Sequence, residues 1–295
     1  MTKTLQNRWT IFSLVAPGIL VFFGAVFFPI ILSVYYGMTD STGINDMKFI
    51  GLRNYIELIT RDDVFWTALL HSFLIGVGYI VLQHPVCVVL AVMLDKLSGK
   101  MEKFFRAVYF VPSVVSVVIV TKMWVYMYNS DFGIFNKLLE MIGLGQYKQQ
   151  WLGDTNISFL CILIMTTWIG FGYGFLMYYA GIKGIPEELY EAARIDGASE
   201  LKLYTRIMLP LLSPIIKVNV TLAMINALKQ MEIIYLATNG GPANSTQVLA
   251  NYLYSKAFAS FQYGYANAIS VVFAIICLLT TLLFNKLINK DIGVY

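Results

Sequence analysis

Glu191-Ala-Ala-Arg-Ile-Asp-Gly197 and, nine residues later, Ile207-Met-Leu-Pro210 form one charged block between two long apolar runs. Pro186 and the two glutamates after it predict a helix start, because proline suits the first helical position and acids suit the positive end of the helix dipole. We expect this helix to run to about Ile195. Gly197 then has the conformational freedom that a sharp turn needs.

A second helix is expected after this turn, because Ser199 followed by Glu200 is typical of a helix N-cap. Ala192 and Ala193 leave little side chain on the first helix, so another protein could approach its backbone closely. The block therefore predicts a helix, a sharp turn and a second helix. An ordinary helical loop with no partner is the simpler alternative.

The runs outside the block decide the fold class. Hydrophobic residues make up 58% of the 295 residues and charged residues only 13%, which excludes a soluble globular domain of ordinary composition. A helix needs about 20 mostly apolar residues to cross the hydrocarbon core. The sequence therefore predicts an all-α integral membrane protein with six transmembrane helices in one domain over residues 12–288. We place the spans at residues 12–37, 67–94, 104–128, 157–181, 214–237 and 266–288.

The distribution of lysine and arginine predicts the orientation of these spans. When the loops are assigned alternately to the two sides, thirteen of the 21 basic residues fall on one side and six on the other. Cytoplasmic loops carry this excess. We therefore expect the N-terminus (1–11), the loop over residues 182–213 and the C-terminus (289–295) in the cytoplasm. The net charge of +4 reflects this bias and gives no reason to invoke nucleic acid.

Polar groups interrupt the fifth predicted span. Asn219, Asn226 and Gln230 recur at spacings of seven and four and so share one helix face, while Lys229 and Glu232 are three residues apart and can pair. Such groups are costly when they face lipid. We expect this stripe to face the bundle interior and to hydrogen-bond a hydroxylated solute in transit. The alternative is that it satisfies itself against neighbouring helices, with the pair only neutralising two charges.

The fourth predicted span holds Trp168 and three glycines at positions 170, 172 and 174, with Tyr173 before the last. Glycines four apart favour close helix packing, which is the simpler interpretation. A Gly-Tyr-Gly stretch also occurs in potassium-channel filters, but a filter lies in a re-entrant loop and this run is continuous. Trp168 and Tyr173 join the candidate substrate path.

Other residue types give no sign of an enzyme. Cys87, Cys161 and Cys277 all fall inside predicted spans, at spacings that suit neither a metal site nor a disulfide framework. No Walker phosphate loop is present in the sequence, so this chain cannot hydrolyse ATP by itself. We predict no cofactor and no metal site in it. His84, beside Pro85, is interpreted as a packing or hydrogen-bonding residue, with a proton relay as the minor alternative.

The spacing of the charged block resembles the cytoplasmic signature loop of the membrane-spanning subunits of binding-protein-dependent ABC importers. A second stretch, Thr238-Asn-Gly-Gly-Pro242, is a strong turn signal and resembles the external segment between the fifth and sixth spans of carbohydrate-importer permeases. Together with Asp196-Gly197-Ala198, it makes the chain similar to the maltose- and glycerol-3-phosphate-type permeases. The positions that carry the loop signature are Glu191, Ala192, Ala193, Gly197, Ile207, Leu209 and Pro210.

The resemblance implies a type I importer permease fold in a bacterial or archaeal cytoplasmic membrane. It implies pairing with a second related permease, two ATPase subunits that bind ATP and Mg²⁺, and an extracytoplasmic solute-binding protein. The substrate would be a sugar, either an oligosaccharide or a related polyol, moved by alternating access. The loop over residues 182–213, here called the coupling loop, would transmit movement from the ATPase. Its expected coupling residues are Glu191, Ala192, Ala193, Asp196, Gly197, Ile207, Leu209 and Pro210.

Two alternatives from other classes remain open at this point. A secondary transporter would need ion-coupling acids within the spans, and only Glu232 qualifies, with Lys229 available to neutralise it. A channel would need a filter or a pore loop. Either would transport without nucleotide and without partner subunits, which an importer permease does not do.

Overall fold

A computed structural model describes residues 8–44 and 46–287. These residues form helices and loops, with one isolated bridge between Thr39 and Phe49. The all-α prediction is confirmed. The predicted termini at 1–7 and 289–295 lie outside the described residues. The chain divides into two compact units, Met1–Asp62 with Leu253–Ile276 and Asp63–Tyr252 with Cys277–Tyr295, where the sequence predicted one domain.

The first unit begins with one long apolar helix. It comprises α1 (Arg8–Phe22), a π-helical turn and α2 (Phe28–Gly37), which together make 30 continuous helical residues. A short helix, α3 (Arg53–Thr60), follows the loop after α2. Its buried Asn54 donates hydrogen bonds to the carbonyl oxygens of Gly37 at 2.9 Å and of Thr39 at 2.8 Å. These bonds hold the loop against the end of the first span.

Four predicted spans are confirmed as continuous helices. The first is α1 with α2, and the second joins α4 (Asp63–Gly78), a π-helical segment (Tyr79–Gln83) and α5 (His84–Asp95). The fourth is α9 (Ser158–Lys183), and the sixth is α16 (Tyr263–Leu287). Between these lie the shorter helices α8 (Ile134–Met141) and α15 (Leu249–Tyr254).

The third predicted span is broken rather than straight. Its two helices, α6 (Gly99–Val114) and α7 (Val117–Met127), meet at an angle of 93°. Pro112 lies in the last turn of α6 and has no N–H to donate to the helix. Val115, three residues later, has an extended backbone conformation. The prediction of one continuous helix over 104–128 is therefore wrong, because the chain is extended at Val115 between the two helices.

The fifth predicted span is also interrupted. Just before this span, in the predicted loop, the chain bends by 65° at Leu212, between α12 (Leu209–Leu211) and α13 (Ser213–Leu228). The helix over 214–237 is not continuous, because α13 ends at Leu228 and α14 (Glu232–Ala237) starts three residues later. Neither proline nor glycine occurs between the two helices. No residue type in the sequence therefore predicts the break between α13 and α14.

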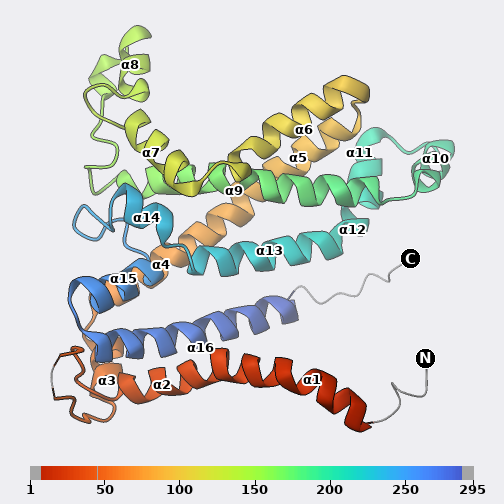
Figure 1. Cartoon of the computed structure of the whole chain (residues 1–295). Coiled ribbons are helices and arrows are strands. Elements are labelled where there is room, and N and C mark those ends of the chain that lie inside the picture. Colours follow the sequence, from red (N-terminus) through yellow and green to blue (C-terminus); the bar gives the residue numbers. More distant parts are fainter. Residues whose placement is uncertain (1–7, 45, 288–295) are drawn as a thin grey trace. The chain divides into compact units, whose positions relative to one another are not determined.

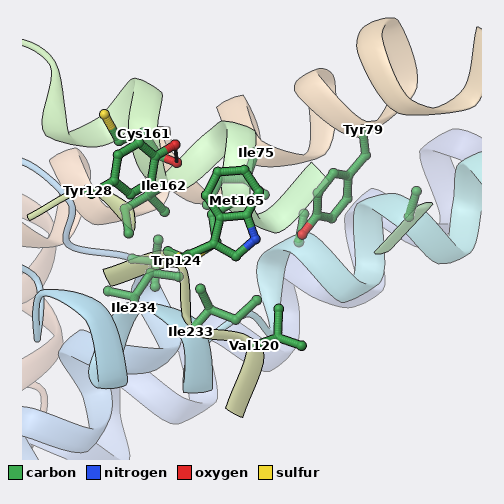
Figure 2. Packing of buried hydrophobic residues seen from close by; sticks show 13 residues of the cluster. Ile75, Tyr79, Val120, Trp124, Tyr128, Cys161, Ile162, Met165, Ile233 and Ile234 are labelled. Atoms are coloured by element: carbon green, nitrogen blue, oxygen red, sulfur yellow. Dashed lines mark hydrogen bonds between the residues drawn. The ribbon is translucent and has the colours of Figure 1, made fainter. Parts of the chain in front are cut away.

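In the second unit α9 contacts α5, α6 and α13 along its length (Figure 1). Two apolar clusters hold these helices together. In the first, Trp124 lies among Met165, Ile233 and Ile234 (Figure 2). The second cluster joins α5 and α9 to the coupling loop, and its buried members include Leu94, Phe175, Tyr178, Ile182, Met208 and Leu212.

Candidate functional site

A cavity of about 400 Å³ lies within the second unit, lined by α9, α13, the break after α13 and the π-helical segment before α5. We call it the transmembrane cavity. Its volume falls in the range of small-molecule sites, about 300–1,000 Å³. Five residues of the predicted substrate path line it: Tyr173, Asn219, Asn226, Lys229 and Gln230.

The other two predicted path residues lie elsewhere. Trp168 lines a separate, mostly apolar groove of about 520 Å³ and packs edge-on against Trp124. Glu232 is exposed at the start of α14. It makes no ion pair with Lys229 within the described part of the chain, because the helix ends between them. The predicted Lys229–Glu232 pair is therefore wrong.

Two cavity residues were missed as site residues. Gln83 and His84 follow one another at the end of the π-helical segment, and both are buried. Gln83 Nε2 donates to the carbonyl oxygen of Gly170 at 2.8 Å, and His84 Nδ1 lies 3.1 Å from the hydroxyl of Tyr178. A polar pair inside an otherwise apolar run was the signal that could have found them.

The glycines of α9 permit close approach on two different faces. Gly170 faces the second span, where a Cβ added to it would lie 3.1 Å from Gln83 Oε1. A Cβ at Gly172 would lie 2.6 Å from Ser113 Oγ and 2.9 Å from the Tyr109 carbonyl oxygen on α6. These glycines lie inside the continuous helix α9. The packing interpretation therefore fits, and this stretch does not form a re-entrant filter.

The first helix of the coupling loop is α10 (Glu187–Ile195), which begins directly after Pro186. It ends as expected at Gly197, whose φ of +75° favours glycine. The Gly197 N–H donates to the Arg194 carbonyl oxygen at 3.1 Å, and the Ala198 N–H donates to the Ala193 carbonyl oxygen at 2.9 Å. This pair of bonds is a Schellman motif, which satisfies the carbonyl groups at the helix end.

The second helix of the loop consists of α11 (Glu200–Leu203), a π-helical segment (Tyr204–Met208) and α12. Ser199 takes the N-cap position as predicted, although its side chain makes no capping hydrogen bond. Met208 is buried against α5 and α9, whereas the three signature residues nearby are half-buried. Those three are Ile207, Leu209 and Pro210.

The two helices of the loop differ in exposure. No residue of α10 is buried, and Glu191, Ala192 and Asp196 are exposed while Ala193 is half-buried. Ile195 is 85% exposed and Leu201 on α11 is 72% exposed. The loop thus presents an uncovered face with apolar residues on α10 and at the start of α11. The second helix anchors the loop in the core through the buried Leu203 and Met208.

Ionic contacts connect the coupling loop to the end of α5. Glu200 lies 3.4 Å from Lys96 and 3.7 Å from Arg194, and it accepts a hydrogen bond from the Tyr204 hydroxyl at 2.8 Å. The bond from Tyr204, with smaller contributions from the two cations, lowers the pKa of the Glu200 carboxyl. All four residues border a cavity of about 830 Å³ beside the loop.

The turn at Thr238-Asn-Gly-Gly-Pro242 is fixed by its own hydrogen bonds. The hydroxyls of Thr238 and Thr246 lie 2.6 Å apart, and the Thr246 hydroxyl donates to the Gly241 carbonyl oxygen at 2.7 Å. Gly240 has a φ of +87°, and a Cβ there would lie 2.5 Å from Gln247 Oε1. The φ thus favours glycine at this position, and any larger residue would also displace the Gln247 side chain.

Comparisons with known proteins agree with this arrangement. The chain is 36% identical over 283 residues to "Probable ABC transporter permease protein YurN" of Bacillus subtilis (strain 168), covering 95% of this chain and 96% of that protein. It is 32% identical to "Multiple sugar-binding transport system permease protein MsmF" of Streptococcus mutans serotype c (strain ATCC 700610 / UA159), with 98% of each chain covered.

A chain of a bacterial alginate ABC transporter, crystallised with an alginate pentasaccharide-bound periplasmic protein, superposes with a TM-score of 0.85 over 99% of both chains. At 23% identity this likeness shows the fold, and the predicted importer-permease fold is confirmed. The family described as "Binding-protein-dependent transport system inner membrane component" matches residues 87–292, more than half of the chain. The protein is therefore a multi-pass membrane protein that belongs to the binding-protein-dependent transport system inner membrane components.

Proposed function

We propose that this chain is the permease subunit of an ATP-driven importer that moves a sugar across the cytoplasmic membrane by alternating access. The observation that carries the proposal is the exposed helix α10, joined through the Gly197 turn to a second helix that is buried against the membrane spans. A force applied to α10 would pass to α5 and α9 through these packed residues. The proposed coupling residues are those of the sequence prediction.

The partner of α10 in this proposal is an ATPase subunit that binds ATP and Mg²⁺. Glu191 makes a polar contact with it, Ala192 and Ala193 let its surface approach the helix closely, and the exposed Ile195 offers it an apolar contact. Two such subunits, a second related permease and an extracytoplasmic solute-binding protein complete the importer. A ligand can shift such a two-state equilibrium only through its different affinities for the two states.

The proposed substrate path follows the transmembrane cavity. Asn219, Asn226 and Gln230 line it on the α13 side and Tyr173 on the α9 side, and amide and hydroxyl groups suit the hydroxyls of a sugar. Asn226 and Lys229 are exposed in this chain by itself. The second permease would cover them and complete the path. Trp168 and Glu232 are not part of this proposed path.

The proposed topology places the coupling loop in the cytoplasm of a bacterial or archaeal cell, together with the termini at 1–11 and 289–295. The excess of basic residues on that side supports this orientation. A cysteine introduced at Leu201, which is 72% exposed, should be labelled by a membrane-impermeant maleimide only after the cells are opened. Labelling in intact cells would contradict the orientation.

Reconstituted transport tests the proposal as a whole. The chain is co-expressed with its own second permease and ATPase and inserted into liposomes that contain ATP. The solute-binding protein is added outside, and radiolabelled maltose, trehalose, raffinose and cellobiose are supplied one at a time. We expect uptake of at least one sugar that requires both ATP and the binding protein. Uptake without nucleotide would instead support a secondary transporter or a channel.

A further inference from the structure

Three of the buried polar side chains that line the transmembrane cavity each have one atom without a hydrogen-bond partner among the described residues. Gln83 and His84 are each 6% exposed, and Asn219 is 3% exposed. The unpaired atoms are Gln83 Oε1, His84 Nε2 and Asn219 Nδ2. They come from the second span and from α13, more than 130 residues apart in the sequence.

The orientation of the Gln83 amide is fixed by its other end. Nε2 donates to the carbonyl oxygen of Gly170 at 2.8 Å, so the remaining atom, Oε1, is an acceptor. Gly170 allows this contact because a Cβ there would lie 3.1 Å from Oε1. Gln83 therefore offers the cavity one acceptor that the protein itself does not use.

His84 is held by Tyr178. The Tyr178 hydroxyl is fully buried and lies 3.1 Å from His84 Nδ1, its only acceptor in the described structure. We assign the hydroxyl as the donor, which leaves the ring proton of the neutral imidazole on Nε2. His84 Nε2 and Asn219 Nδ2 are then two donors on the same cavity as the Gln83 acceptor.

Leaving these atoms unpaired is unfavourable. A buried donor or acceptor without a partner loses its hydrogen bonds to water with no compensation, and apolar residues at the same positions would avoid that cost. The π-helical segment Tyr79–Gln83 ends immediately before His84, and such segments frequently occur at functional sites. The three groups are therefore better explained by a ligand that satisfies them than by packing.

We propose that Gln83, His84 and Asn219 form a subsite that binds the hydroxyl groups of the transported sugar. This inference rests on the proposed function. A hydroxyl both donates and accepts hydrogen bonds, so it can donate to Gln83 Oε1 and accept from Asn219 Nδ2, and a neighbouring hydroxyl accepts from His84 Nε2. Because the three groups are neutral, the subsite fits an uncharged polyhydroxylated ligand. Ordered water is the competing occupant.

The test uses the complete reconstituted importer and the sugar that it transports best in the panel above. Uptake is measured at saturating loaded binding protein for the wild type, Gln83→Leu and Asn219→Leu, with the parent sugar and with each of its monodeoxy analogues. Thr121→Val is the matched control, because Thr121 Oγ1 is also buried with no partner in the described part of the chain but does not line the cavity. Co-purification with the ATPase verifies the assembly of each variant.

For the parent sugar we expect each cavity variant to lower the uptake rate about tenfold, the effect of losing about 1.4 kcal/mol of hydrogen bonding. We expect Thr121→Val to leave the rate unchanged. For one deoxy analogue, the wild type should fall to the rate of the Gln83→Leu variant, because the bonding hydroxyl is absent. His84→Phe should show the same behaviour with a neighbouring hydroxyl.

Two results would overturn the subsite. Cavity variants that transport the parent sugar at the wild-type rate would show that water or nothing occupies the three groups. An equal loss of rate with every analogue would show that the residues act only in packing. If the wild type imports no sugar at all, the proposed function fails, and this inference fails with it.

Discussion

All the hydrogen bonds that close the turn at Gly197 lie within one segment of six residues, from Ala193 to Ala198. The transmembrane cavity instead gathers side chains from positions 79 to 233 and leaves three buried polar atoms with no partner among the residues that the structure describes. The turn is thus complete as a local structure and needs a partner only on its outer face. The cavity is incomplete until something enters it. We infer that the loop acts as a rigid element and the cavity as an adaptable one.

The largest expected effect comes from breaking the local structure of the loop. Gly197→Pro should abolish uptake and leave membrane insertion intact, because proline cannot adopt a φ near +75° and removes the N–H that bonds to Arg194. Uptake in the reconstituted importer and the amount of protein in the membrane are the two measurements. Gly197→Asn is the control, since asparagine tolerates a positive φ. Normal uptake by the proline variant would show that this turn is not needed for coupling.

The next effect tests the close packing of α9 against α6. Gly172→Ala should lower the free energy of unfolding by about 1–3 kcal/mol, because the new Cβ meets backbone on α6. Gly174→Ala is the matched control, with its nearest neighbour at an ordinary 3.4 Å. Thermal unfolding in detergent measures both variants. Equal stability of the two would show that α6 and α9 do not pack as described.

A smaller effect is expected at the polar stripe. Asn226→Leu or Gln230→Leu should reduce uptake several-fold without disturbing assembly, because a lost hydrogen bond is worth about 0.5–1.5 kcal/mol. Val218→Leu on the same helix is the control, since Val218 is exposed and does not line the cavity. Initial uptake rates and co-purification of the ATPase measure the two properties. Unchanged uptake kinetics in these variants would show that Asn226 and Gln230 have only a structural role.

The smallest effect should come from the ionic contacts of Glu200. Glu200→Gln should change uptake by about twofold or less, because exposed ion pairs contribute little. Because its pKa is lowered, the Glu200 carboxylate stays charged below the usual pKa of a glutamate, and the contacts are lost only as the pH falls through the lowered value. Uptake per ATP hydrolysed, measured between pH 6 and 8, should therefore be flat. A steep change in this range would point to a different titrating group.

The same comparison explains what could be predicted from the sequence. Pro186, Gly197 and Ser199 act on their immediate neighbours, so the helix-turn-helix of the coupling loop was predictable residue by residue. Four spans were predictable because length and hydropathy are sufficient for a continuous helix. The break between α6 and α7 was not predicted, and Pro112 alone does not mark it, because Pro17 lies inside the continuous helix formed by α1 and α2.

Other features depend on contacts that no local pattern reports. The end of α13 at Leu228 has no breaker residue, and it separates Lys229 from Glu232. Asn219, Asn226 and Gln230 were found through their spacing, but Gln83 and His84 join them only because Gly170 lets α9 approach the second span. Trp168 shares its helix with Tyr173 and yet lines a different groove.

The most direct test of the central claim is the purification of the tagged chain from its native host in mild detergent, followed by mass spectrometry of the subunits that accompany it. Gly197→Pro and Gly197→Asn are purified in parallel. We predict that the native chain and the asparagine variant bring down an ATPase and a second permease, and that the proline variant retains the permease but loses the ATPase. Recovery of the native chain alone, or equal recovery of the ATPase with all three proteins, would contradict coupling through this loop.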